Sequence, residues 1–403
     1  MLRERGFQMN IVIFIISIVT FLLSISCLFL EIYIFKKAPF LAINLPKVPI
    51  NTSLTVIIPA YNEELNIIKC LNALNKISKP SNHFKILVVD DSSNDKTFLN
   101  VENFKSQVSK NPEELEIVAS GPRPTDKKWV GKNWPCYVGS KGIKSEWILF
   151  LDADVEVGEN CIRKALAKAS KDNIDLLSLA PKVNCNCLAE WMVQPIMTSL
   201  LMLGFPISDT NDKNSNTAFA AGPFMLFKSE SYKIIKGHEG THDEVVEDIA
   251  LAKKIKDSNL KLNFLIAIKD ISLNMYQDFN ALIEGWSKNW FLGLEKNFLK
   301  SISASVFVFL TYSMPWLLFG ISIIIALKNQ TTSFLPVVFM SFLAIFSYVF
   351  KRYLLKAQYN IPAKYWFLSG LGGIIVVYIS ILSIFKTYTG KGWTWKGRNL
   401  SKT

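Results

Sequence analysis

Four long stretches without charged residues dominate the hydrophobic pattern of this chain. A helix needs about 20 apolar residues to cross a hydrocarbon core of roughly 30 Å, and each stretch is long enough. The pattern predicts an N-terminal transmembrane anchor (1–35) and about three transmembrane helices within 301–386. The stretches are Ile11 to Leu30 and those between Lys300 and Lys328, Lys328 and Lys351, and Lys364 and Lys386.

The first stretch is interpreted as a retained anchor. Arg3 and Arg5 precede it, as in a signal peptide, but it is too long for one, and Leu28 to Ile32 is not a small-residue cleavage site.

A fifth uncharged stretch, 191–208, is only marginally long enough to span. Gln194, Pro195 and Thr198 interrupt it. We expect it to lie in the membrane interface or to be buried against the neighbouring domain. A crossing at this point would place the polar motifs on its two sides, described below, in different compartments.

Between residues 52 and 300, short apolar runs alternate with amphipathic stretches. Strands followed by helices predict an α/β fold with a mainly parallel sheet covered on both faces, and ligands of such sheets bind at the carboxyl ends of the strands. Residues 36–51, with three lysines and three prolines, are predicted to be a linker, and residues 387–403 a basic tail. The predicted strands are 54–58, 84–89 and 147–151, and the predicted helices are 63–77 and 95–108.

Composition narrows the class of protein. Half of the residues are hydrophobic, the mean hydropathy is +0.24, and the net charge is +12. With this hydrophobicity, the basic excess favours a membrane surface or a phosphorylated substrate as partner, and no nucleic acid. The six cysteines are scattered, so we expect reduced thiols facing a reducing compartment.

Two polar clusters follow the first two predicted strands. Pro59-Ala60-Tyr61-Asn62-Glu63-Glu64 follows the first strand, and Asp90-Asp91-Ser92-Ser93 follows the second. Each is compatible with an ordinary strand-to-helix turn with capping residues. Adjacent acids after a buried strand need partners, however, and the base and ribose of a nucleotide would supply them.

The other two clusters carry paired acids. Asp152-Ala153-Asp154 ends the strand 147–151, and residues two apart in an extended chain point the same way, so both carboxylates can converge on one cation. Carboxylate oxygens suit Mn²⁺ or Mg²⁺, with a nucleotide diphosphate filling the remaining positions. Glu247-Asp248 opens an apolar helix. Acids there are stabilised by the helix dipole, but one is also a candidate general base.

In this order, the four clusters resemble the family 2 glycosyltransferases, whose fold is the Rossmann-like GT-A fold. The resemblance covers about residues 52–300. It implies transfer of a sugar from a nucleotide-diphosphate sugar (UDP- or GDP-sugar) to a hydroxyl or carboxyl of a lipid acceptor. Segments similar to the membrane-bound hopanoid-associated and carotenoid glycosyltransferase branch are Trp129 to Trp134, Gly222 to Phe227, Lys236 to Glu239 and Trp395 to Arg398.

The resemblance also implies roles for single residues. Asp152 and Asp154 serve the metal and the diphosphate, and Asp248, beside Glu247, is the base of an inverting displacement. The donor is expected to contact Ala60, Tyr61, Glu63, Asp90, Asp91, Lys132 and Asp152.

An acceptor region is expected around His238 and Glu239 and around Trp286 and Trp290. The two tryptophans lie four apart, on one face of a helix. They suit stacking on a sugar or lipid and anchoring at the membrane surface equally well.

Two rival functions stay open at this point. Processive polysaccharide synthases carry a Q-x-x-R-W motif, whereas the corresponding segment here has Lys288 in place of the arginine, which favours addition of one or a few sugars. A catalytically inactive membrane scaffold would have lost an acid from the four clusters, and none is lost.

The string His238-Glu239-Gly240-Thr241-His242 matches the H-E-x-x-H motif of zinc proteases. That chemistry requires both histidines on one face of a regular helix. Gly237 and Gly240 argue against such a helix, and no later histidine follows as a third ligand. We therefore expect a loop rather than a zinc site.

The expected membrane topology contains a conflict. Nucleotide sugars are cytosolic, so the catalytic domain of this integral membrane protein is expected to face the cytoplasm, in a bacterium from the inner membrane. Three later spans would put the C-terminus on the opposite side, yet the basic residues of 387–403 favour the cytoplasm. One of the three stretches is then re-entrant or interfacial.

Overall fold

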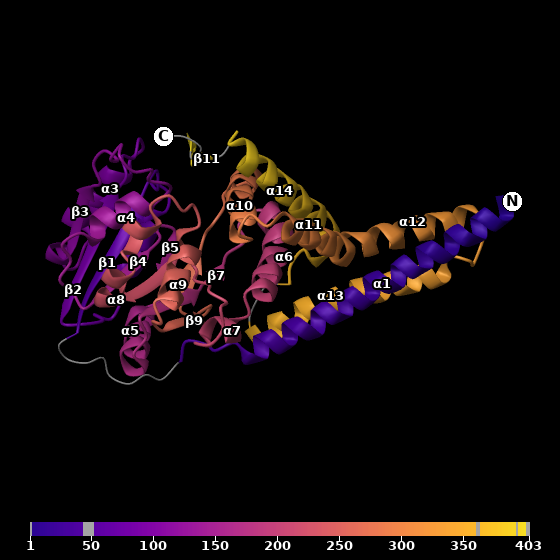
Figure 1. Ribbon diagram of the computed structural model, residues 1–403, viewed down its shortest axis with the longest axis horizontal. Coiled ribbons are helices and arrows are strands. Elements are labelled where there is room, and N and C mark those ends of the chain that lie inside the picture. Colours follow the sequence, from indigo (N-terminus) through magenta and orange to yellow (C-terminus); the bar gives the residue numbers. More distant parts are fainter. Residues whose placement is uncertain (1, 43–51, 360–362, 392–393, 400–403) are drawn as a thin grey trace. The chain divides into compact units, whose positions relative to one another are not determined.

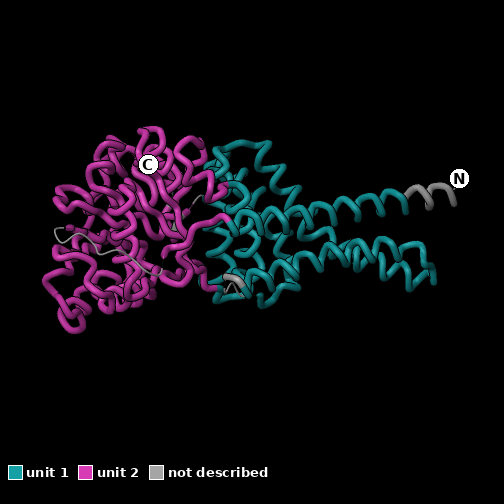
Figure 2. Tube along the Cα trace, turned by 90° about the horizontal axis from the view of Figure 1, so that it is seen from below, with its two compact units in different colours: residues 1–36, 185–204, 276–391 teal, residues 37–184, 205–275, 392–403 magenta. Residues whose placement is uncertain are grey.

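The computed structural model describes residues 2–42, 52–359, 363–391 and 394–399. Most of the predicted linker 36–51 and the last residues of the predicted basic tail therefore lie outside the described residues. The chain divides into two compact units (Figure 2). The helical unit comprises 1–36, 185–204 and 276–391, and the α/β unit comprises 37–184, 205–275 and 392–403.

The α/β unit is built on a seven-stranded sheet with the order β3-β2-β1-β4-β8-β6-β9 (Figure 1). All neighbouring pairs are parallel except those of β8, which is antiparallel to both β4 and β6. The predicted mainly parallel sheet is thereby confirmed. Its strands are β1 (Ser53–Ala60), β2 (His83–Asp90), β3 (Leu115–Ala119), β4 (Trp147–Leu151), β6 (Leu176–Ala180), β8 (Phe224–Lys228) and β9 (Leu262–Ile266).

Apolar residues cover both faces of this sheet. In β1, Val56 and Ile58 belong to one hydrophobic cluster, whereas Ile57 between them belongs to a second cluster on the other face. Successive side chains of a strand point to opposite faces, and a strand buried on both faces becomes a continuous apolar run. This is why the predicted strands contain almost no polar residues.

Helices and short strands fill the connections of the α/β unit. The predicted helix 63–77 is shorter in the structure, and helix 95–108 is nearly as predicted. The helices are α2 (Ile67–Leu74), α3 (Thr97–Gln107), α4 (Asn133–Ser140), α5 (Cys161–Asp172), α7 (Ile207–Asn211), α8 (Ser229–Ile234) and α9 (Glu247–Asp257), with the 3₁₀ turns η1 (Pro112–Glu114) and η2 (Gly237–Thr241). The short strands are β5 (Val155–Val157), β7 (Lys182–Val183), β10 (Ile271–Leu273), β11 (Thr394–Trp395) and β12 (Arg398–Asn399).

One edge of the sheet collects the polar clusters. Because β1, β2 and β4 are parallel, their carboxyl ends meet at this edge. The antiparallel strand β8 begins there, since Phe224 pairs with Leu151 at the end of β4. The residues just before β8 thus join those just after β1, β2 and β4.

The helical unit contains four helices that are long and apolar enough to cross a membrane, at Asn10–Lys37, Phe298–Lys328, Leu335–Ala357 and Trp366–Thr389. This confirms one N-terminal and three C-terminal candidate spans. The elements of the unit are α1 (Leu2–Lys37), α6 (Leu188–Gly204), α10 (Phe279–Gly293), α11 (Phe298–Val308), the π-turn η3 (Phe309–Ser313), α12 (Met314–Lys328), α13 (Leu335–Tyr359), η4 (Trp366–Leu368) and α14 (Ser369–Thr389).

Helix α6 corresponds to the fifth uncharged stretch, and it groups with the apolar helices rather than with the α/β unit. It packs against α14 with very close backbones, because a Cβ added at Gly372 would lie 2.2 Å from the carbonyl oxygen of Met192. The compact units therefore do not follow the expected boundaries, in which 52–300 was one continuous domain.

Candidate active site

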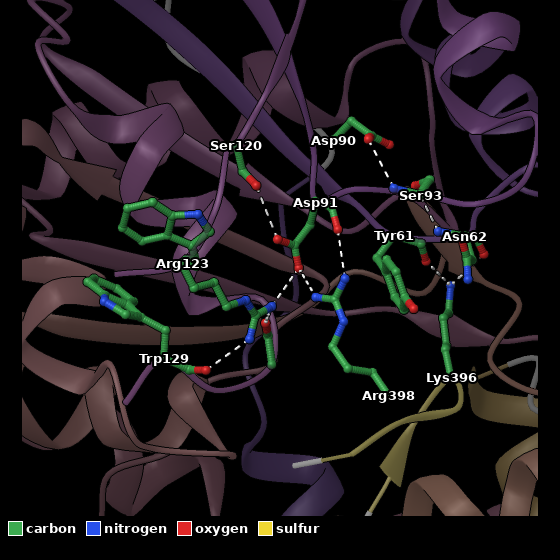
Figure 3. A network of polar contacts seen from close by, with 12 residues as sticks. Tyr61, Asn62, Asp90, Asp91, Ser93, Ser120, Arg123, Trp129, Lys396 and Arg398 are labelled. Atoms are coloured by element: carbon green, nitrogen blue, oxygen red, sulfur yellow. Dashed lines mark hydrogen bonds and ion pairs between the residues drawn. The ribbon is translucent and has the colours of Figure 1, made fainter. Parts of the chain in front are cut away.

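Asp91 is the centre of a buried polar network at the sheet edge (Figure 3). Its carboxylate is only 3% exposed and accepts a hydrogen bond from Ser120 Oγ at 3.1 Å. Two guanidinium groups also donate to it, from Arg123 at 2.5 Å and from Arg398, which lies 307 positions later in the chain. Arg398 additionally donates to the carbonyl oxygen of Asp91 at 2.8 Å. Charge-assisted bonds of this kind compensate a buried carboxylate.

The C-terminal hairpin β11–β12 brings a second basic residue to the same edge. Lys396 Nζ donates to the carbonyl oxygens of Tyr61 and Asn62, both at 3.1 Å, and forms an ion pair with Glu63. The guanidinium of Arg398 lies 3.8 Å from the ring centre of Tyr61, which is a cation–π contact. The hairpin thus lies on the loop that follows β1 (Figure 3).

Lys132 joins the third and fourth acid clusters. Its Nζ lies 2.5 Å from Asp152 Oδ1 and 3.3 Å from Glu247 Oε1. Burial acts to lower the pKa of Lys132, but Asp152 and Glu247 outweigh it and hold the pKa well above its usual range. The residue is therefore a fixed positive charge at the carboxyl end of β4.

The position of Lys132 follows from the packing of the segment around it. Asn133 is fully buried, and its amide donates to the carbonyl oxygens of Val130 and Glu244 at 3.0 and 2.8 Å. Helix α4, which starts at Asn133, lies so close to the sheet that a Cβ at Gly139 would come within 2.8 Å of both Ile57 and Val89. A glycine is needed there for this approach.

Asp154 has an uncompensated carboxylate. Among the described residues, none donates a hydrogen bond or forms an ion pair with its side chain. Burial raises its pKa well above the usual range, and the neighbouring carboxylates of Asp152 and Glu63 raise it further. Carboxylate oxygens such as those of Asp152 and Asp154 are suitable ligands for a divalent cation. No group of three or more metal-ligating side chains occurs in the described part of the chain, so further ligands would come from a bound substrate or water.

Asp248 lies beside Lys132 in a position suited to a base. The N–H of Gly222, just before β8, donates to Asp248 Oδ2 at 3.0 Å. Burial raises the pKa of Asp248 to about 7, and the adjacent Glu247 contributes to that rise. A carboxylate with this pKa can accept a proton near neutral pH.

Ala60 and Asp90 also lie at this edge, in structural contacts. The carbonyl oxygen of Ala60 accepts from the N–H of Asp91 at 2.8 Å. Asp90 is buried, and its Oδ2 accepts from the N–H of Ser93 at 3.1 Å. Its Oδ1 has no partner among the described residues.

A cavity of about 450 Å³ opens beside Asp91. It is large enough for part of a small-molecule ligand. Its walls include Ser92, Arg123, Lys128, Trp129 and Arg398.

Two residues expected in the acceptor region, His238 and Glu239, belong to the α/β unit. His238 is 1% exposed and packs 4.5 Å from the ring of Phe150, with its Nδ1 2.8 Å from the hydroxyl of Tyr232. Burial lowers its pKa to about 3. Glu239 is exposed and pairs with Lys127 at 2.7 Å. His238 is therefore a neutral packing residue in this structure, and its expected place near an acceptor stays a prediction.

The H-E-x-x-H string forms the 3₁₀ turn η2 and not a regular α-helix, as expected. His242 Nδ1 lies 2.8 Å from the carbonyl oxygen of Lys128. The two histidines are thus held apart by separate contacts and do not form the zinc-protease arrangement.

Trp286 and Trp290 belong to the helical unit. Trp290 is buried and its indole N–H donates to Ser380 Oγ at 3.0 Å, while that of Trp286 donates to Gln194 at 3.0 Å. Both indole N–H groups thus serve helix packing. Trp290 is thus a packing residue of the helical unit, and its expected place in the acceptor region stays a prediction.

The sequence motifs gave no indication of Arg123 as a site residue, and Gly222, Lys396 and Arg398 entered only as parts of similar segments. One signal was present in the sequence. Only six of the 45 basic residues are arginines, and two of those six meet at Asp91. A chain that otherwise uses lysine needs arginine where a planar, forked donor must pair with a carboxylate.

Known proteins resemble this chain in sequence and in fold. The family described as glycosyl transferase family 2 matches residues 55–235. A 4,4'-diaponeurosporenoate glycosyltransferase of Staphylococcus haemolyticus (strain JCSC1435) is 27% identical over 244 residues, which cover 60% of this chain and 62% of the relative. This chain thus spans less than two thirds of that relative's length. The protein of the same name from Staphylococcus aureus (strain USA300) is 26% identical over 306 residues, 74% of this chain and 76% of the relative.

A solved structure shares the fold. The mannosyltransferase PcManGT from Pyrobaculum calidifontis, in complex with GDP-Man and Mn²⁺, superposes with a TM-score of 0.53 at 15% identity, covering 94% of this chain and 99% of that one. The α/β unit therefore has the GT-A fold that the motifs predicted. Residues 55–235, most of which lie in this unit, match the family 2 glycosyltransferase model.

Proposed function

We propose that this protein transfers a sugar from a nucleotide-diphosphate sugar to a lipid acceptor, with inversion at the anomeric carbon. The observation that carries the proposal is the grouping of Lys132, Asp152, Glu247 and Asp248 at one sheet edge, beside the Asp91 cavity. A fixed cation next to a carboxylate with a pKa near 7 suits displacement of a diphosphate by a hydroxyl.

In this proposal Asp248 accepts the proton of an acceptor hydroxyl, while the oxygen of that hydroxyl attacks the anomeric carbon. The bond from that carbon to the diphosphate oxygen breaks, and the nucleoside diphosphate leaves. Lys132 holds positive charge where the diphosphate gains negative charge. Asp91 and the loop after β1 bind the nucleoside part, at the cavity of about 450 Å³.

Asp152 and Asp154 are proposed to hold Mn²⁺ or Mg²⁺. A cation bound there would neutralise charge on the diphosphate. The support is the carboxylate of Asp154, which has no hydrogen bond or ion pair among the described residues and whose pKa is raised by burial and by the carboxylates of Asp152 and Glu63.

The proposed acceptor is a lipid with a hydroxyl or carboxyl group. The two staphylococcal relatives are named for a carotenoid acid, and the apolar helices of this chain suit delivery of such an acceptor from a bilayer. We propose addition of one or a few sugars, because Lys288 replaces the arginine of the processive synthases.

The α/β unit is proposed to face the cytoplasm, where nucleotide sugars are made. Hairpin β11–β12 contacts Asp91 and Glu63 of this unit, so it must lie in the same compartment. Three full crossings between residues 298 and 389 would separate the two. Helix α14 is the proposed exception, because it packs against α6 and α10, and neither of these is a candidate span.

A donor screen tests the function. Purified full-length protein in lipid nanodiscs is incubated with UDP- and GDP-sugars and a carotenoid or polyprenyl lipid extract, and products are read by mass spectrometry. A lipid carrying one hexose or a few is expected. Long chains on a sizing gel would instead support a processive synthase, and no transfer from any nucleotide sugar would contradict the proposal.

A further inference from the structure

Three hydrogen bonds already occupy the buried carboxylate of Asp91. Oδ1 accepts from Ser120, and Oδ2 accepts from both Arg123 and Arg398. With 3% of the side chain exposed, a nucleotide base could reach this carboxylate only if one of the donors left. Buried acceptors exchange partners rather than give them up.

Of the two arginines, Arg398 is the one that can leave. Arg123 is also bonded to the carbonyl oxygens of Trp129 and Gly131, both at 2.9 Å, in a loop of the same domain. Arg398 contacts Asp91 and the ring of Tyr61, and it lies on a hairpin of two-residue strands. So short a hairpin has little stability of its own.

The guanidinium of Arg398 resembles a nucleotide base in its planar shape and in the hydrogen bonds that it donates. It is planar, it donates N–H groups to the Asp91 carboxylate, and it lies 3.8 Å from the ring centre of Tyr61. Uracil and guanine are planar too, stack on aromatic rings, and carry ring N–H donors. Asp91 and Tyr61 could thus bind either the guanidinium of Arg398 or a nucleotide base.

We propose that Arg398 occupies the base subsite when no donor is bound, and that the base of the incoming nucleotide displaces it from Asp91 and Tyr61. The C-terminal hairpin Thr394–Asn399 is then a strap that competes with the donor. This inference rests on the proposed nucleotide-sugar function of the site. A protein whose binding-competent state is only partly populated binds its ligand more weakly by that fraction, so the strap lowers apparent donor affinity.

Calorimetry on the full-length protein in nanodiscs tests the strap. UDP, GDP and inorganic pyrophosphate are titrated into wild type, Arg398→Ala, Arg398→Gln and the control Lys391→Ala, an exposed basic residue ahead of the hairpin. We expect both Arg398 variants to bind UDP or GDP about fivefold more tightly. Pyrophosphate, which has no base, and Lys391→Ala should show no change. Weaker nucleotide binding by both Arg398 variants would overturn the strap.

Hydrogen exchange of the wild-type protein gives a second readout that needs no variant. Saturating UDP or GDP should speed exchange across 394–399, because the hairpin leaves the site. Slower exchange would mean that the hairpin closes on the bound donor, which overturns the proposal while leaving the glycosyltransferase site intact. If neither nucleotide binds wild type or either Arg398 variant, the donor site itself is wrong and the strap fails with it.

Discussion

The backbone N–H of Gly222 donates a 3.0 Å hydrogen bond to Oδ2 of Asp248. A Cβ at Gly222 would lie 3.2 Å from both this oxygen and Lys132 Nζ. The start of the antiparallel strand β8 therefore orients the acid of α9 against the cation that precedes α4. Three segments distant in sequence meet at one carboxylate.

Asp248→Asn should lower the transfer rate by about 10²- to 10⁴-fold, the usual contribution of a positioned proton acceptor. An amide keeps an oxygen for the Gly222 hydrogen bond but cannot accept the acceptor's proton. The rate is measured with radiolabelled donor under saturating conditions. Asp257→Asn, at the exposed end of the same helix, is the control and should keep wild-type activity. Full activity in Asp248→Asn would refute the base assignment.

The pH profile of kcat/KM should report Asp248. Its pKa is raised to about 7 by burial and Glu247, and only the deprotonated form accepts a proton. Activity toward a hydroxyl acceptor should therefore fall about tenfold per pH unit below pH 7 and level off above it. A carboxyl acceptor is already ionised in this range and should lack that dependence. A flat profile with a hydroxyl acceptor would argue against this base.

Gly139→Val should weaken donor binding although residue 139 touches no ligand. The added side chain meets Ile57 and Val89, since even its Cβ would lie 2.8 Å from each. We expect a loss of about 1–3 kcal/mol in the free energy of unfolding and a raised KM for the donor, because α4 carries Lys132 at its start. Gly204→Ala is the control, as nothing lies within 4 Å of its Cβ position. Unchanged melting temperature and KM in Gly139→Val would contradict the close packing.

Asp154→Ala should raise the concentration of Mn²⁺ or Mg²⁺ needed for half-maximal activity by about tenfold or more. The variant removes one of the two carboxylates proposed to hold the cation. Activation curves after EDTA treatment measure the effect. Asp243→Asn removes an exposed carboxylate of the same unit and should leave the curve in place. A normal curve for Asp154→Ala would mean that the cation binds elsewhere.

Lys391→Cys should react with a membrane-impermeant maleimide from the same side as Lys171→Cys. Lys391 leads into the hairpin, and Lys171 is exposed on α5 of the α/β unit. The half-buried native thiols Cys185 and Cys187 are replaced by serine beforehand. Labelling from opposite sides would show that the hairpin and the α/β unit are in different compartments, and would exclude the contacts of Arg398 with Asp91.

The strands and the sheet edge were predictable because they depend on local patterns. The run Trp147–Leu151 is a strand with the predicted bounds, since five consecutive apolar residues bury both faces. The direction of β8 was not predictable. Phe224–Lys228 is as apolar as the parallel strands of the sheet. An apolar run does not indicate whether its strand is parallel or antiparallel to its neighbours.

The site was predictable as far as its acids lie at strand ends. Asp91, Asp152 and Asp248 follow or face those ends. The order of their clusters along the chain led to the roles expected for them. The contacts of Arg398 could not be found this way, because 307 positions separate it from Asp91 and no periodic pattern links them. The burial of His238 could not be predicted either. Its glycine-rich surroundings suggest an open loop, but the ring fills the core next to Phe150.

The contact of Arg398 with Asp91 also has a consequence for biosynthesis. The ribosome makes Asp91 early, whereas Arg398 emerges only after residues 298–389, which contain three long apolar helices. The donor site therefore remains without its strap until those helices have been synthesised and inserted. A fragment ending before residue 298 would lack Lys396 and Arg398. Its nucleotide affinity would therefore match that of the incomplete nascent chain and not that of the full-length protein.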